Sequence, residues 1–141
     1  MRARIAKANR DEGFTLIELL VVMIIIGILA AIAVPVFLNQ RQKAQDSATK
    51  ADVTSIGKEI AAYFVDNSTA PTVTVVSGSY TVNAVTVARQ SQSTMGTPAA
   101  YFNATNPSQS WCVQLTNTAG SSTGKTWKYS ASGGLQNGTT T

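Results

Sequence analysis

The chain has 141 residues, of which eleven are basic and seven acidic, so its formal net charge is +4. A net charge of this size is too small to indicate nucleic-acid binding by itself. The sequence has no histidine and a single cysteine, Cys112, so it lacks the most versatile general base and any intramolecular disulfide. These features argue against most hydrolytic and redox enzymes, and we expect no catalytic residue, no metal site and no cofactor.

Residues 1–13 form a short basic segment with Arg2, Arg4, Lys7 and Arg10, and they end in a small residue, Gly13. An ordinary secretory signal has its small-residue cleavage site after the apolar core, so the core is discarded. Here Gly13 precedes the apolar core. The basic side chains predict that this end of the chain stays in the cytoplasm.

An apolar run from Leu19 to Leu38 follows, without a charged residue, between Glu18 and Arg41. Twenty residues are about the length that a helix needs to cross a bilayer core of roughly 30 Å. Gly27 and Pro35 interrupt the run. Proline removes a helical hydrogen bond, so both residues are candidate hinges, although a kink without functional consequence is the alternative.

The helix is expected to continue past the apolar run, from about residue 14 to residue 65. Its second half is polar but carries an apolar stripe at helical spacing: Val53, Ile56, Ile60 and Phe64. Asp66 and Pro71 then end the helix. The stripe predicts packing against a sheet formed by the rest of the chain.

Residues 67–141 are rich in Ser and Thr and contain no acidic side chain. We predict one small antiparallel sheet, with Ser77-Gly78 turning its first hairpin, and therefore an α+β fold. Residues 90–110 are expected to be an irregular connection, and residues 133–141 a frayed tail. The strand candidates are residues 72–76, 79–87, 111–116 and 125–130.

The ordered stretch Gly13-Phe14-Thr15-Leu16-Ile17-Glu18, with the apolar run behind it, resembles the type IV pilin family. That family includes the pseudopilins of type II secretion and competence systems. The resemblance implies that a prepilin peptidase cuts between Gly13 and Phe14 on the cytoplasmic side and methylates the new amine of Phe14. It also implies that Glu18 pairs with the Phe14 amine of a neighbouring subunit. The alternative is that Glu18 only faces lipid headgroups.

The resemblance divides the chain into four parts: a leader (1–13), a membrane and filament-core helix (14–38), its amphipathic continuation (39–66) and a sheet domain (67–141). It implies a structural subunit of a type IV pilus. The precursor spans the bacterial cytoplasmic membrane with the sheet domain outside, and a membrane platform and ATPase assemble it into an extracellular homo-oligomeric filament. The alternatives are a major pseudopilin of a secretion or competence system, and an uncleaved membrane-anchored binding module.

Three further features of the sheet domain bear on function. Arg89, Lys125, Trp127 and Lys128 suggest a weak polyanion patch for DNA, with solubilising cations as the bland alternative. The absence of acids after Asp66 argues against a calcium site there. Cys112 is interpreted as an inert small residue rather than a reactive thiol.

Overall fold

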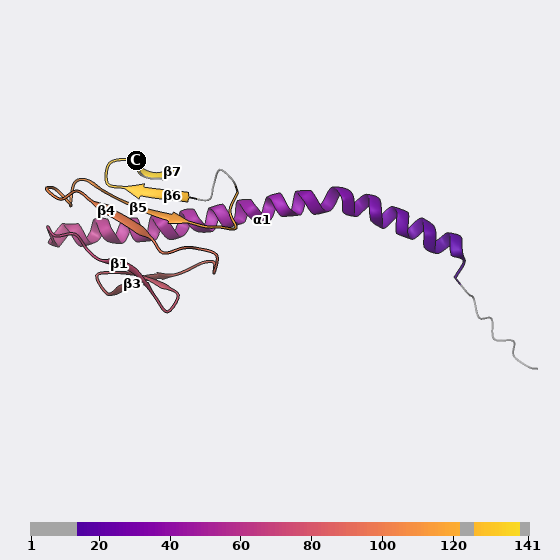
Figure 1. The fold of residues 1–141 in the computed structure, drawn as a ribbon, viewed down its shortest axis with the longest axis horizontal. Coiled ribbons are helices and arrows are strands. Elements are labelled where there is room, and N and C mark those ends of the chain that lie inside the picture. The colour runs from indigo at the N-terminus through magenta and orange to yellow at the C-terminus, as the bar shows by residue number, and fades with distance from the viewer. Residues whose placement is uncertain (1–13, 122–125, 139–141) are drawn as a thin grey trace, which may run out of the picture. The chain divides into compact units, whose positions relative to one another are not determined.

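The computed structural model describes residues 14–121 and 126–138 (Figure 1). The chain forms two compact units, one ending at Phe37 and one beginning at Leu38. Within these residues one helix, α1 (Leu16–Asp66), is followed by seven strands. The strands are β1 (Val73–Val76), β2 (Ser79–Val82), β3 (Val85–Arg89), β4 (Ala99–Phe102), β5 (Trp111–Thr116), β6 (Thr126–Ser130) and β7 (Gly134–Asn137). The predicted α+β fold is confirmed.

The helix α1 has the predicted extent to within two residues. Every residue from 14 to 44 is exposed, and the buried side chains begin at Thr49. At its end, the backbone N–H and the side-chain amide of Asn67 both donate to the Tyr63 carbonyl oxygen, at 3.2 and 3.0 Å. Asn67 therefore satisfies a carbonyl that has no partner within the helix.

Strands β1, β2 and β3 form an antiparallel sheet in that order. The prediction of one strand over residues 79–87 was wrong, because Asn83 and Ala84 separate β2 from β3. These two residues have φ angles of 49° and 68°, as Ser77 and Gly78 have in the first hairpin, at 49° and 72°. Two successive positive φ angles fit the twist of a tight hairpin. Alanine rarely adopts this conformation, so Asn83-Ala84 carries little sequence signal for the turn.

Strands β4 to β7 form a second antiparallel sheet in sequential order. The prediction of a single sheet was therefore wrong, as was the irregular connection at 90–110, which contains β4. The predicted frayed tail at 133–141 was wrong for residues 134–137, which form β7, while residues 139–141 lie outside the described residues. Both strands have four residues, and each pairs along its whole length with a longer strand, β4 with β5 and β7 with β6. Pairing with a longer neighbour stabilises strands too short to show a period in the sequence.

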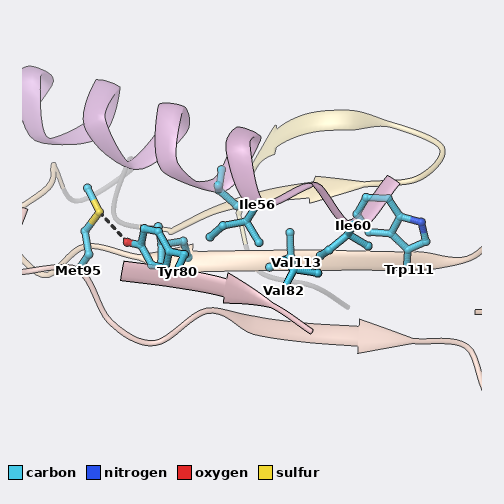
Figure 2. Close-up of a cluster of buried hydrophobic side chains, with 9 residues drawn as sticks. Ile56, Ile60, Tyr80, Val82, Met95, Trp111 and Val113 are labelled. Atoms are coloured by element: carbon cyan, nitrogen blue, oxygen red, sulfur yellow. Dashed lines mark hydrogen bonds between the residues drawn. The ribbon is translucent and has the colours of Figure 1, made fainter. Parts of the chain in front are cut away.

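The hydrophobic core lies between the second half of α1 and the two sheets (Figure 2). The predicted stripe is confirmed: Val53, Ile56 and Ile60 are fully buried, and Phe64 packs against the same cluster. The strands contribute further side chains to this cluster: Tyr80 and Val82 from β2, and Trp111, Val113 and Leu115 from β5. Every second residue of β5 thus faces the helix, as the alternation in its sequence predicts.

Polar side chains of α1 hold the long connections between strands. The Asp52 carboxylate, 4% exposed, accepts hydrogen bonds from the Ser91 hydroxyl and, at 2.9 Å, from the Ser91 backbone N–H. The Asp46 carboxylate accepts the corresponding pair from Ser121, at 3.0 Å from the N–H and 2.6 Å from the hydroxyl. Hydrogen bonds to charged acceptors are the stronger kind, so these loops are fixed by the helix.

Two fully buried side chains extend this polar layer. The Asn117 amide group donates to Gln45 Oε1 at 3.1 Å, while its Oδ1 accepts from Thr94 Oγ1 at 2.7 Å. The Tyr80 hydroxyl donates to Met95 Sδ at 3.3 Å, the contact dashed in Figure 2. Burial, with a smaller contribution from the negative charge of Asp52, raises the pKa of Tyr80 well above its ordinary value, so this hydroxyl keeps its proton.

A glycine allows the closest approach between α1 and the four-stranded sheet. Gly57 is buried, and a Cβ atom placed there would lie 2.9 Å from Tyr129 Cβ and closer still to the Tyr129 ring. The Tyr129 ring cannot move away easily, because it stacks on Trp111 with centroids 6.2 Å apart. Gly57 is therefore required by packing, despite its low helix propensity.

We expect Gly57→Ala to lower the free energy of unfolding of the full-length protein by about 1–3 kcal/mol, because overpacking outweighs the gain in helix propensity. In a Tyr129→Gly background neither the ring nor the Cβ atom of Tyr129 remains, so the overpacking disappears and the same substitution should raise stability by up to about 1 kcal/mol. Urea unfolding in detergent, followed by tryptophan fluorescence, measures both changes. An equal cost of Gly57→Ala in the two backgrounds would contradict the packing argument.

Candidate functional site

The N-terminal end of α1 is capped by a side chain. The Glu18 backbone N–H donates to Thr15 Oγ1 at 3.3 Å, and the Leu19 N–H donates to the Thr15 carbonyl oxygen at 3.3 Å. Thr15 is thus the N-cap residue of α1, three positions before Glu18. The pattern Thr-x-x-Glu is a sequence signature of a helix start. The role of Thr15 at the helix start was not predicted, although this pattern is visible in the sequence.

After this cap, the first half of α1 presents an apolar surface that no other described residue covers. All residues from Phe14 to Leu38 are exposed, Phe14 at 84%. Within the residues that the structure describes, α1 is the one helix long and apolar enough to cross a membrane. An exposed apolar surface of this extent marks contact with lipid or with other protein chains.

Glu18 is the acidic residue of the first turn of α1. Its side chain is exposed, and among the described residues no cation forms an ion pair with it. Phe14 lies one helical turn earlier, while Gly13, the predicted cleavage position, lies outside the described residues. A carboxylate at a helix N-terminus gains roughly 0.3–1 kcal/mol from the helix dipole, which is less than the cost of placing it in a bilayer interior.

Both candidate hinges lie inside an uninterrupted helix. Residues 16–66 are helical through Gly27 and through Pro35. A Cβ atom added at Gly27 would meet no other atom within 4 Å, so no packing requires glycine there. Pro35 leaves one carbonyl of the preceding turn without its helical N–H donor. Their role as hinges stays a prediction.

The four residues of the predicted polyanion patch are distributed over different parts of the domain. Arg89 is at the end of β3 in the three-stranded sheet, Trp127 and Lys128 are neighbours on β6, and Lys125 lies outside the described residues. Trp127 pairs with buried Leu115, so its ring is on the helix side of the sheet. There Lys50 Nζ lies 4.2 Å from the centre of the Trp127 ring. The ring therefore packs on α1, and DNA binding stays a prediction.

Cys112 lies half-buried on the opposite face of the four-stranded sheet, between Tyr101 of β4 and Ser130 of β6. Burial raises the pKa of the Cys112 thiol, and the positive charge of Lys128 partly opposes that rise. Cys112 and Lys128 thus lie close enough for the charge of Lys128 to act on the thiol, which their separation in the sequence did not indicate. Within residues 14–121 and 126–138, no three His, Cys, Asp or Glu side chains cluster as metal ligands would.

Replacing Lys128 by glutamine should raise the pKa of Cys112 further, because the neighbouring positive charge that favours the thiolate is gone. We expect slower alkylation of Cys112 by iodoacetamide near pH 8, and a rate profile displaced to higher pH. Arg89→Gln removes the same charge from the other sheet and serves as the matched control. Equal slowing in both variants would contradict the local effect of Lys128.

The family described as the prokaryotic N-terminal methylation motif matches residues 8–34. The chain is also similar to the type II secretion system core protein G of several bacteria. It is 36% identical over 64 residues to that of Dickeya chrysanthemi (45% of this chain, 42% of the relative) and 38% over 66 residues to that of Vibrio cholerae (47% and 45%). For Pseudomonas aeruginosa the identity is 38% over 63 residues (45% and 44%).

The matches thus span less than half the length of these curated relatives. No solved structure is significantly similar to the chain. The resemblance predicted from the stretch that begins at Gly13 is confirmed: residues 8–34 match the methylation motif, and the chain is similar to type II secretion core protein G over less than half of its length.

Proposed function

We propose that this chain is a pseudopilin, a structural subunit of a short filament in a type II secretion system. The observation that carries the proposal is an exposed apolar helix with one acid, Glu18, at its entrance, within a matched methylation motif. The similarity to type II secretion core protein G favours this function over the type IV pilus that the sequence first suggested. The pilus subunit becomes the alternative.

In this proposal a prepilin peptidase removes residues 1–13 on the cytoplasmic side and methylates the Phe14 amine. Cleavage before the apolar run leaves the helix attached to the sheet domain, so the processed subunit stays in the cytoplasmic membrane. The sheet domain lies outside that membrane. A membrane platform and a cytoplasmic ATPase then move subunits from the lipid into a homo-oligomeric filament.

The physical basis of assembly is the exposed segment from Phe14 to Leu38. Moving apolar helices from lipid into a protein bundle gains little hydrophobic free energy, because both surroundings are apolar. A carboxylate in the bilayer interior costs roughly 2.5–3.5 kcal/mol, and less near the end of a span. Pairing Glu18 with the Phe14 amine of a neighbour removes part of that cost, so the pair favours assembly in one register.

Glu18→Gln should leave cleavage after Gly13 intact but strongly reduce filament formation, because the side chain no longer pairs with the Phe14 amine. Mass spectrometry of the intact subunit reads cleavage and methylation, and chemical cross-linking in cells followed by filament isolation reads assembly. Asp66→Asn, which neutralises an exposed acid at the far end of α1, is the matched control. Filaments of Glu18→Gln at the control level would overturn the assembly role of Glu18.

Deleting the gene in its native cell should abolish release of exported proteins into the medium and leave long surface fibres intact. This outcome separates the two filament types, because a pilus subunit is needed for fibres that shearing recovers from the cell surface. Loss of sheared fibres with normal secretion would establish the alternative. A chain that still begins at Met1 in the membrane fraction would exclude both and indicate an anchored module.

A further inference from the structure

The outer face of the four-stranded sheet, opposite the core, carries a cleft of about 430 Å³. The strand register aligns its lining residues in two rows, Tyr101 with Cys112 and Ser130, and Lys128 with Gln136. None of these side chains belongs to the hydrophobic core. The volume is in the range of sites that hold small molecules. The cleft also touches Phe102 and Trp111, which belong to the core or pack against it, but the five outward-facing side chains are not used in core packing.

The cleft is positively charged, and no described acidic side chain lines it. Lys128 is half-buried in it, and no described carboxylate forms an ion pair with Lys128. No side chain of the sheet domain can supply a counter-ion, because the sequence contains no acidic residue after Asp66. An ammonium group that is partly removed from water favours a nearby negative charge. The charge of Lys128 already acts on the Cys112 thiol in the same cleft.

The neutral side chains of the cleft offer mainly hydrogen-bond donors. Asn103 Oδ1 already accepts from the backbone N–H groups of Thr105 and Asn106, at 2.8 and 3.0 Å, so its NH₂ group is the part left for a ligand. Ser130 Oγ accepts from the Gly133 N–H at 3.1 Å, so its hydroxyl hydrogen remains to donate. Donors beside an ammonium group suit a ligand rich in oxygen acceptors.

An aromatic ring adds a flat apolar surface to the cleft. Tyr101 is 49% exposed and does not belong to the hydrophobic core, so its ring is accessible to a ligand. A ring-shaped ligand with one apolar face can stack on Tyr101 while its polar groups reach the donors. A carboxylate on the same ligand would neutralise Lys128.

We propose that this cleft binds a sugar residue that carries a carboxylate, of the uronic acid class. Lys128 receives the carboxylate, Tyr101 supports the sugar ring, and the amide and hydroxyl groups of Asn103, Ser130 and Gln136 bind the ring hydroxyls. The inference is independent of the proposed function, because a subunit that fails to assemble keeps the cleft.

Cys112 provides the test, because it is the single cysteine of the chain and lies in the cleft. The full-length protein in detergent is alkylated with iodoacetamide in rising concentrations of methyl glucuronide, methyl glucoside or propionate. We expect saturable protection by the glucuronide at concentrations at least about tenfold lower than for the neutral glucoside, since a charge-assisted contact is lost in the latter. Each rate is divided by the rate of the same variant without ligand, which removes intrinsic changes in thiol reactivity.

The variants then assign the residues. Lys128→Gln should weaken protection by the glucuronide about tenfold or more, whereas Arg89→Gln should leave it unchanged. Tyr101→Ala should weaken protection by both sugars. Equal protection by the glucuronide and the glucoside, or an unaffected Lys128→Gln variant, would overturn the carboxylate contact. Protection by propionate as strong as that by the glucuronide would overturn the sugar assignment.

Discussion

The structure depends on one constraint: the helix α1 must be apolar and exposed along its first half, and must pack into the folded domain along its second half. Its first half, to Leu38, has no partner for its apolar side chains within the described chain. Its second half buries Val53, Ile56 and Ile60 completely in the core. The hydrophobic effect therefore acts on the two halves in different places, in the folded domain for one and in lipid or among other helices for the other. A subunit that is to be anchored first and assembled later needs this division.

Charge follows the same division. All acidic side chains after Gly13 lie on α1, and two of them, Asp46 and Asp52, accept hydrogen bonds from the loops that connect the strands. The helix thus supplies polar anchors as well as an apolar stripe, and a domain without acids of its own acquires fixed connections. Removing one such carboxylate would leave the N–H and hydroxyl of a serine without their acceptor. The loops depend on the helix as much as the core does.

Much of this architecture was predictable from the sequence, and the limits have physical causes. The stripe Val53–Phe64 and the alternation in β5 repeat often enough to define a period, and the stretch from Gly13 to Glu18 is specific by order alone. The turn at Asn83-Ala84 has no glycine, so the local sequence carried little signal for a turn. Strands β4 and β7 exist because longer neighbours pair with them. The grouping of Cys112, Lys128 and Tyr101 arises from register across three strands, which no spacing in the sequence encodes.

Assembly, core packing and surface binding involve different residues of the chain. A filament of the proposed kind could therefore change what it binds without changing how its subunits fold. In the proposed function the first helical turns hold the processing and assembly signals, whereas residues 49–64 of α1 and the inner faces of the strands form the core. The outer face of β4 to β7 takes part in neither. Substitutions there change charge and shape without the cost of a cavity or an unpaired buried group. Selection can therefore alter what the surface binds while processing and packing stay the same, so the chemistry around Lys128 and Tyr101 is where differences between otherwise similar filaments are expected.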